Sequence, residues 1–207
     1  MTLIGHTVTD LLAAFRSTAP TPGGGSAAAL AGAIGASLLA MVAGLPKSRA
    51  ATAEDIARLQ AAGDRCGALS AELELLVDRD SDAYELVMAA YKKPKATDEE
   101  KAARSAAIQA AMREAIAAPL AVMRACAAAT EQGVVIASLG NPSAWSDAQV
   151  GFELLGAALR GAKLNAEINL GSVKDADYAA TIRGEAGELE RALGHEREAA
   201  RRAQGVR

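Results

Sequence analysis

The feature that most constrains this chain is a run of 20 residues, Ser26–Leu45, without a single charged side chain. Alanine, glycine and leucine dominate the run, so it favours a helix over a strand. In a soluble protein, a helix that is apolar on every face has to be surrounded by other helices. A membrane span is the alternative, but small side chains gain little from lipid and no second span is evident. We therefore expect an all-α, multihelical bundle wrapped around a buried central apolar helix.

The rest of the chain divides into helices bounded by prolines, glycines and capping patterns. Thr97-Asp-Glu-Glu100 is a complete capping box, and Ser146-Asp-Ala-Gln149 predicts another helix start. Pro119 falls inside a helix, where the missing amide hydrogen should cause a kink. Nothing reads as a linker, so we treat residues 1–207 as a single helical domain. The expected helices cover residues 7–17, 26–44, 52–91, 97–133, 146–170 and 175–204.

Composition excludes several functional classes. A formal charge of -3 and scattered basic residues give no field for a nucleic acid. The two cysteines lack ligand spacing, and the two histidines have no acidic or cysteine partners nearby in sequence, so we expect no metal. The start of the chain, MTLIGHTVTDLLAAF, lacks the basic flank of a signal peptide. We expect a cytoplasmic protein that contacts neither nucleic acid nor membrane.

Three glycines, Gly23, Gly24 and Gly25, precede the uncharged run, with Ser26 as the expected N-cap. The free amides of a first helical turn bind anions, and a glycine-rich turn lets a ligand approach them. The chain lacks the Gly-Lys-Ser/Thr of a P-loop and the strand of a dinucleotide fold. The turn either holds a carboxylate or carbonyl-bearing ligand, or is a tight turn in which glycine permits positive φ.

Five segments together resemble one known family. PTPGGGSAAALAGAIGASLLAMVAGL, from Pro20, is similar to the start of the formimidoyltetrahydrofolate cyclodeaminase and methenyltetrahydrofolate cyclohydrolase family. Further matches, in the same order, are Asp78-Arg-Asp-Ser-Asp-Ala-Tyr84, the stretch Lys95–Arg104, Gly140-Asn141 with Ser146-Asp147-Ala148, and Leu164-Asn165 with Asn169. The resemblance implies an all-helical, typically dimeric enzyme without a metal, which acts on one-carbon derivatives of tetrahydrofolate and needs no cofactor beyond that substrate.

One segment departs from the family. Members usually carry a longer L-T-x-G-K-K-x-Y segment after the apolar helix, where this chain has Leu45-Pro-Lys-Ser-Arg49. Within this shorter segment, the resemblance implies that Lys47 contacts the substrate.

Carboxylates are the expected catalytic groups, because the family's reactions pass through a tetrahedral carbon between two nitrogens and need a proton carrier that can oppose a cation. Asp78 and Asp82 share one helix face, while Asp80 points about 160 degrees away from both. The family motif favours Asp80 as catalytic, with Asp78 beside it as a substrate contact. Asp147, in the first turn of its helix, is either a second catalytic carboxylate or an ordinary helix-start residue.

Amide side chains are candidates for holding the pterin ring. Asn165 and Asn169 lie one turn apart and either bond the ring edge or bond another helix across a dimer. Asn141 is a further contact in the family pattern, or shapes the turn before Pro142. Lys92, Lys93 and Lys95 form a solvated loop or attract a folate polyglutamate tail.

The leading hypothesis is a homodimeric cyclohydrolase that converts 5,10-methenyltetrahydrofolate to 10-formyltetrahydrofolate. The chain is too short to include a formiminotransferase domain, which favours this reaction over the first alternative, a formimidoyltetrahydrofolate cyclodeaminase that releases ammonia. The second alternative is a non-catalytic, folate-binding helical dimer, and it rests on the departure after Leu45.

Overall fold

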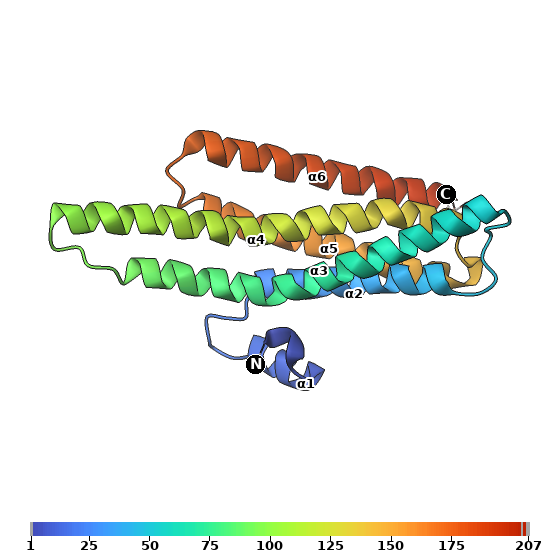
Figure 1. The fold of residues 1–207 in the computed structure, drawn as a ribbon, viewed down its shortest axis with the longest axis horizontal. Coiled ribbons are helices and arrows are strands. Elements are labelled where there is room, and N and C mark those ends of the chain that lie inside the picture. The colour runs from blue at the N-terminus through green and yellow to red at the C-terminus, as the bar shows by residue number, and fades with distance from the viewer. Residues whose placement is uncertain (1, 204, 206–207) are drawn as a thin grey trace.

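The computed structural model describes residues 2–203 and 205, in which all regular structure is helical (Figure 1). The all-α prediction is therefore confirmed. The elements are η1 (Leu3–Gly5), α1 (Val8–Phe15), α2 (Gly24–Gly44), α3 (Ala53–Tyr91), α4 (Asp98–Leu139), η2 (Pro142–Ala144), α5 (Trp145–Leu170) and α6 (Ala176–Ala203). The expected end of the last helix, at residue 204, lies outside the described residues.

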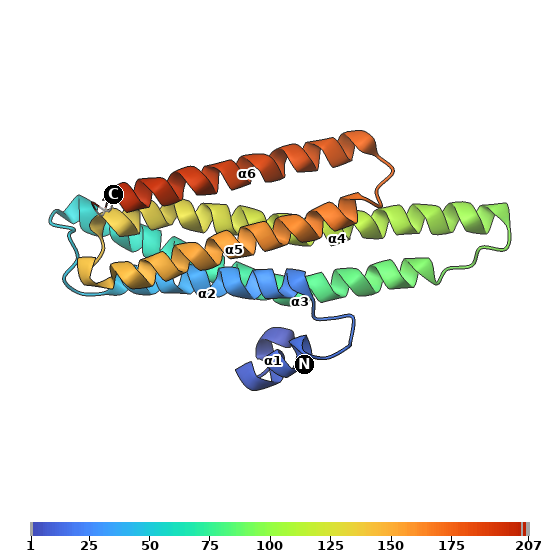
Figure 2. The same ribbon diagram turned by 180° about the vertical axis from the view of Figure 1, so that it is seen from behind.

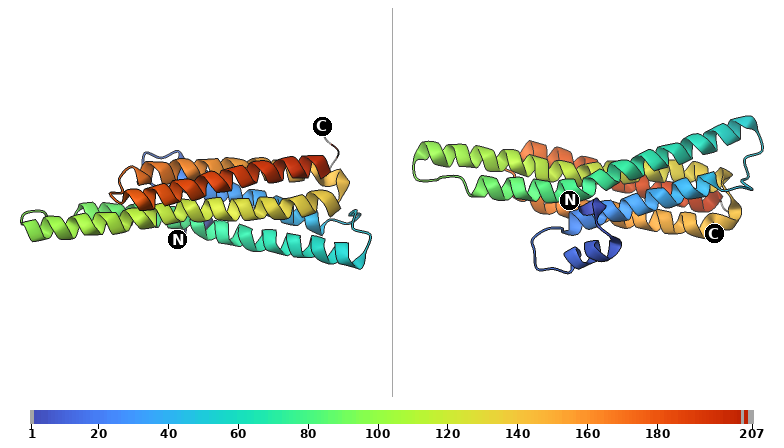
Figure 3. Two further views of the ribbon diagram at one scale, coloured as in Figure 1. Left: turned by 90° about the horizontal axis from the view of Figure 1, so that it is seen from above. Right: turned by 60° about the horizontal axis from the view of Figure 1, so that its bottom comes forward.

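Helices α2 to α5 run up and down along one long axis, and α6 lies along the outside of α4 and α5 (Figures 1 and 2). The hairpin of α3 and α4 extends beyond the N-terminal end of α2, and α1 stands beside the bundle rather than within it (Figure 3). The start of α2 and the end of α5 therefore meet beneath the projecting hairpin.

The apolar helix α2 packs closely on its neighbours through small residues. A Cβ atom on Gly32 would lie 2.9 Å from the Cys126 sulfur of α4, and one on Gly35 would lie 2.8 Å from the Gly151 carbonyl of α5. However, Ile34 and Met41 are 47% and 44% exposed. Burial on every side is thus not confirmed for the single chain, because three neighbours leave one face of α2 open.

The end of α4 and the start of α5 differ from the prediction. Helix α4 continues through Pro119 and past Gly133 to Leu139, because this glycine makes room for an aromatic ring: a Cβ there would lie 2.6 Å from Cε1 of Phe152. The expected cap at Ser146 is also wrong. Helix α5 starts at Trp145, and Ser146 already lies in its first turn, directly after η2.

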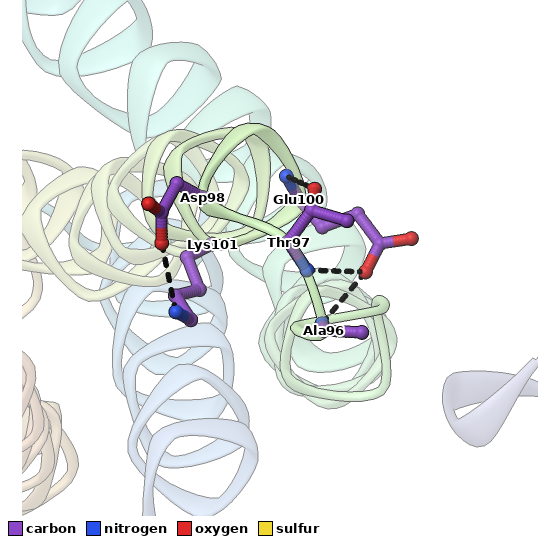
Figure 4. Close-up of polar contacts among 5 residues, drawn as sticks. All are labelled: Ala96, Thr97, Asp98, Glu100 and Lys101. Atoms are coloured by element: carbon purple, nitrogen blue, oxygen red, sulfur yellow. Dashed lines mark hydrogen bonds and ion pairs between the residues drawn. The ribbon is translucent and has the colours of Figure 1, made fainter.

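The capping box of α4 is confirmed (Figure 4). The Glu100 amide donates to the Thr97 hydroxyl at 3.2 Å, and the Glu100 carboxylate accepts from the amides of Thr97 and Ala96 at 3.2 and 2.7 Å. These bonds fix the tip of the α3–α4 hairpin, because they satisfy amides that a helix start leaves free.

Two hydrophobic clusters stabilise the bundle. The main cluster joins all the long helices and includes Cys66 and Cys126, whose pKa values burial raises to about 12. The second cluster lies within the hairpin and consists of Ala83, Val87, Ala90, Ala111, Met112 and Ala115.

By length and composition, α2 and a stretch of α4 are apolar enough to cross a membrane, but 44% and 56% of these stretches are buried inside the protein.

Candidate functional site

The Asp80 carboxylate lies at the N-terminus of α2. Gly23 is the N-cap of this helix, so the expectation that Ser26 caps it is wrong. Ser26 instead occupies the first turn, where its amide donates to Oδ2 of Asp80 at 3.1 Å and its hydroxyl donates to the Val77 carbonyl at 2.7 Å. A carboxylate carried by α3 thereby satisfies a free amide at the start of α2.

The glycines at the start of α2 allow close approach rather than unusual backbone angles. Among the described residues, Gly205 is the glycine with positive φ, so positive φ does not explain the run at Gly23 to Gly25. A Cβ on Gly25 would lie 2.0 Å from Oδ1 of Asp80, and one on Gly24 would lie 3.3 Å from Nδ2 of Asn165. A side chain at Gly25 would therefore displace the Asp80 carboxylate.

A pocket of about 270 Å³ opens beside this carboxylate. It brings together four predicted positions from three helices: Gly24 of α2, Asp80 of α3, and Asn165 and Asn169 of α5. Gly23 also lines it, while Gly25 and Ser26 lie buried behind Asp80. Sequence reasoning did not name the other lining residues as contacts, although the first four lie inside motifs that carry the family resemblance: Pro20, Thr21, Ala83, Tyr84, Val87 and Ala115.

Asn169 is fixed by a carbonyl that Pro119 leaves without a helical partner. Because proline has no amide hydrogen, the carbonyl four residues earlier, at Ala115, loses its usual donor. Nδ2 of Asn169 donates to this carbonyl at 2.8 Å. The bond satisfies one end of the Asn169 amide and holds its side chain at the pocket wall.

Asn165 is held within its own helix. Its Nδ2 donates to the Gly161 carbonyl at 2.9 Å, so the side chain lies along α5 with the pocket beside it. Neither asparagine bonds the other. Each has its amide nitrogen engaged by the protein, which fixes the orientation of the amide oxygen as an acceptor.

The ionisation of Asp80 is set by opposing effects. Burial raises the pKa of its carboxyl above the ordinary 3.8, and the hydrogen bond from the Ser26 amide partly opposes this rise. The result is a more basic aspartate, fixed in one orientation and facing a pocket. A carboxylate with a raised pKa accepts a proton more readily than an exposed one, so it suits proton transfer.

Three of the predicted positions, Lys47, Asn141 and Asp147, lie at the other end of the bundle. Lys47 follows α2, and its loop is held to the end of α4 by the Asn141 side chain, which donates to the Pro46 carbonyl at 2.7 Å. Asp147 is exposed in the first turn of α5. Since α2 has 21 residues, this end lies about 30 Å from the pocket in the same chain.

Asp78 points away from the pocket, on the other side of α3 from Asp80. Its carboxylate accepts from the amides of Leu3 and Ile4 at 2.5 and 3.4 Å. It therefore anchors η1 to α3, and its predicted contact with substrate stays a prediction.

Among the described residues, no group of three His, Cys, Asp or Glu side chains is placed to hold a metal ion. The polar side chains that line the pocket are the Asp80 carboxylate, the amides of Asn165 and Asn169, and the hydroxyls of Thr21 and Tyr84.

The comparison with known proteins agrees with the arrangement of these segments. A sequence profile of the formiminotransferase-cyclodeaminase family matches residues 7–188. The chain belongs to this family. A methenyltetrahydrofolate cyclohydrolase from Methylorubrum extorquens is 39% identical over 174 residues, which make up 84% of each chain.

Longer members of the family share the same segment. The formimidoyltransferase-cyclodeaminase of Sus scrofa is 36% identical over 167 residues, which are 81% of this chain but 31% of that protein. The crystal structure of formiminotetrahydrofolate cyclodeaminase from Thermotoga maritima covers 97% of this chain with a TM-score of 0.85 at 23% identity. The fold is therefore that of the cyclodeaminase family.

Proposed function

We propose that this protein hydrolyses 5,10-methenyltetrahydrofolate to 10-formyltetrahydrofolate. The observation that carries the proposal is the half-buried Asp80, whose carboxylate has a raised pKa and is held by Ser26 beside a pocket lined by two asparagine amides. The similarity to a cyclohydrolase of comparable length supports this reaction over others in the family.

In this reaction, water adds to the cationic carbon between N5 and N10. Asp80 accepts one proton as the water oxygen bonds to that carbon, which gives a neutral hydroxylated ring. The carbon–N5 bond then breaks as Asp80 returns the proton to N5, and the hydroxyl loses its own proton to solvent to form the formyl group on N10. The sum consumes one water and releases one proton.

The ionised form of Asp80 also favours the substrate electrostatically, because the methenyl compound is a cation. The fixed amides of Asn165 and Asn169 present acceptor oxygens to the donor groups of the pterin edge. Since Asp80 has to be ionised to accept a proton, turnover should fall as the pH drops through its raised pKa.

A formimidoyltetrahydrofolate cyclodeaminase is the second candidate. Attack of N10 on a formimino carbon at N5 passes through a tetrahedral carbon in the same place, and the same carboxylate would protonate the departing ammonia. The larger relatives and the Thermotoga maritima structure carry this activity in their names.

Two assays separate the candidates. Loss of methenyltetrahydrofolate absorbance, with and without the purified protein, distinguishes an enzyme from a non-catalytic folate-binding dimer. Release of ammonia from formiminotetrahydrofolate distinguishes the cyclodeaminase from the cyclohydrolase. Absorbance that decays at the uncatalysed rate, with no ammonia released, would rule out both activities.

We further propose that the working form is a homodimer. The open face of α2 presents an apolar stripe with alternating spacings of four and three residues: Ala27, Ala31, Ile34, Leu38 and Met41. Helix α5 carries a similar stripe: Val150, Leu154, Ala157, Gly161, Leu164 and Ile168. The stripes adjoin where Gly161 meets Ala28, and this spacing is the one that packs helix against helix.

A two-fold axis across the middle of the α2 stripe would run two copies of this helix antiparallel. With the centre of the stripe between Ile34 and Leu38, Gly24 of one copy would then face the loop of Lys47 in the other. This packing would bring the distant Lys47, Asn141 and Asp147 toward the pocket of a second copy. In the dimer these three residues could contact the substrate, whereas in a single chain they lie too far from the pocket to reach it.

A further inference from the structure

A groove of about 550 Å³ lies between the end of α2 and the first half of α3. The two helices diverge there, at the end of the bundle opposite the Asp80 pocket (Figure 3). Its walls are mostly small or apolar residues, among them Ala40, Ala43 and Gly44 of α2 and Ile56, Gly63 and Gly67 of α3. We call it the α2–α3 groove.

Two glycines leave the backbone of this groove bare. A Cβ atom on Gly44 or on Gly67 would meet nothing within 4 Å, and both residues are exposed. Gly67 lies in the interior of α3, where glycine costs about 1 kcal/mol relative to alanine. No neighbour within the described part of the chain requires this glycine. A bare backbone beside an apolar groove suits the close approach of another segment.

Helix α1 leaves part of its apolar face uncovered. Val8, Leu11, Leu12 and Phe15 have the spacing of a single helix face. Leu11 is buried but belongs to neither hydrophobic cluster of the bundle, while Val8 and Leu12 are 75% and 53% exposed. A helix of 8 residues is unstable in water unless it packs on something. The uncovered face of α1 therefore needs a surface that the single chain does not give it.

The proposed dimer brings α1 to the groove. Helix α1 follows η1, which the Asp78 carboxylate holds against α3, and Asp78 shares one face of α3 with Gly63 and Gly67. Helix α1 and the groove thus lie on the same side of the bundle, near opposite ends of α2. A two-fold axis that pairs the α2 helices antiparallel keeps both α3 helices on one side. It sets α1 of one copy opposite the groove of the other.

The dimensions and charges of the two surfaces agree. From Ile56 to Gly67 the groove extends about 16 Å along α3, and α1, with 8 residues, is about 12 Å long. Asp64 lines the groove and Arg16 directly follows α1, and both are exposed. Within the described part of one chain, neither has an ion-pair partner. Opposite charges at the edges of two apolar surfaces favour one orientation of docking.

We propose that α1 of each copy docks into the α2–α3 groove of the other copy, with its exposed apolar side chains over the bare glycines. The inference rests on the homodimer proposed above and adds a second contact to it. The segment between α1 and α2 supplies Pro20 and Thr21 to the Asp80 pocket. A docked α1 therefore holds this segment at both ends, so the second copy fixes one wall of the pocket.

The test measures how fast a water-soluble disulfide reagent labels single cysteines placed on α1, at a concentration where light scattering shows a dimer. The native thiols do not interfere, because both are buried with pKa values of about 12. Leu12→Cys, on the apolar face, should react about tenfold more slowly than Ala13→Cys, on the exposed face. In the same dimer, Gly67→Leu should fill the groove and remove this protection.

Gly184→Leu is the matched control, because it makes the same change at an exposed glycine of α6 whose Cβ would also meet nothing within 4 Å. It should leave Leu12→Cys protected. Equal labelling of the two α1 cysteines in a dimer, or protection that survives Gly67→Leu, would overturn the proposal.

A cysteine pair shows which copy supplies the groove. Oxidation of Leu12→Cys/Ile56→Cys should link two chains, seen as a dimer on a non-reducing gel, whereas Ala13→Cys/Ile56→Cys should stay unlinked. A link within one chain would show that α1 docks on its own copy and would overturn the exchange. Light scattering that shows a monomer for the unaltered protein would overturn the proposed homodimer as well, which separates that failure from the failure of α1 to dock.

Discussion

At Asp80, burial and hydrogen bonding act on one carboxylate in opposite directions. The Ser26 amide holds the ionised form, and loss of water favours the protonated form. The net rise in pKa makes this carboxylate a better base than that of an exposed aspartate. Neither effect is visible in the motif, because Ser26 is 54 residues away in sequence.

We predict that Asp80→Asn lowers kcat for methenyltetrahydrofolate hydrolysis by about 10²- to 10⁴-fold, the usual contribution of general acid–base catalysis. The amide keeps the size of the side chain and accepts the Ser26 hydrogen bond, but it cannot carry a proton. The control is Asp82→Asn, at an exposed position on another face of α3, which should change kcat less than about twofold. Near-normal kcat in the Asp80 variant, measured by absorbance decay, would remove Asp80 from the mechanism.

The same substitution should alter stability in a pH-dependent way. A raised pKa means that the folded protein binds this proton more readily than the unfolded chain does. The wild-type free energy of unfolding therefore declines, relative to the variant, as the pH rises from the ordinary 3.8 through the raised pKa, and the difference is constant above it. Urea unfolding of both proteins at about pH 4 and about pH 7.5 checks the sign, and a relative gain by the wild type at the higher pH would contradict it.

At the scale of helices, Pro119 of α4 and Asn169 of α5 are linked through the Ala115 carbonyl, which the proline leaves without a helical donor and the asparagine bonds. Asn169→Ala should lower the free energy of unfolding by about 1–3 kcal/mol, because the Ala115 carbonyl loses its donor. In a Pro119→Ala background the helical amide at position 119 satisfies that carbonyl, so Asn169→Ala should cost clearly less. A double-mutant cycle by urea unfolding measures the coupling, and purely additive costs would show that the two residues act separately.

Substituting alanine for glycine inside a helix should change the free energy of unfolding in opposite directions at two positions, Gly67 and Gly133. Gly67→Ala, on α3, meets nothing within 4 Å and should stabilise the protein by about 0.5–1 kcal/mol through helix propensity. Gly133→Ala, on α4, places a Cβ 2.6 Å from the Phe152 ring and should destabilise it by about 1–3 kcal/mol. Thermal unfolding of both variants tests this, and stabilisation by both would mean that Phe152 readily moves aside.

The helices could be predicted from the sequence to within a few residues wherever their ends depend on local chemistry. Thr97 and Glu100 show this, since both partners of the capping box are close together in the sequence. The helix end predicted at residue 133 is wrong, because the ring for which Gly133 makes room, that of Phe152, belongs to another helix. For the site, the motif pointed to Asp80, but the contact with Ser26 and the wall formed by Ala115 and Tyr84 depend on how three helices pack.

At the scale of the whole molecule, the proposed dimer rests on the open apolar face of α2. We predict that Ile34→Glu, in the middle of the stripe, gives a monomer at micromolar concentration by light scattering where the unaltered protein gives the proposed dimer, because it buries a charge in an apolar contact. Activity should fall together with dimer content. Leu86→Glu, at a comparably exposed leucine of α3, is the control and should leave the mass unchanged. A fully active Ile34→Glu monomer would contradict the proposed role of the second copy.

The reactivity of the two buried cysteines can be used to measure how often the native bundle opens. Cys66 and Cys126 are fully buried, and at neutral pH their raised pKa values of about 12 keep both thiols protonated and unreactive. An aromatic disulfide reagent can then attack only molecules that have transiently unfolded around the main core. The rate of thiol labelling in excess reagent thus measures native-state opening without denaturant, and bound folate should slow both thiols in parallel if the bundle opens as one cooperative unit.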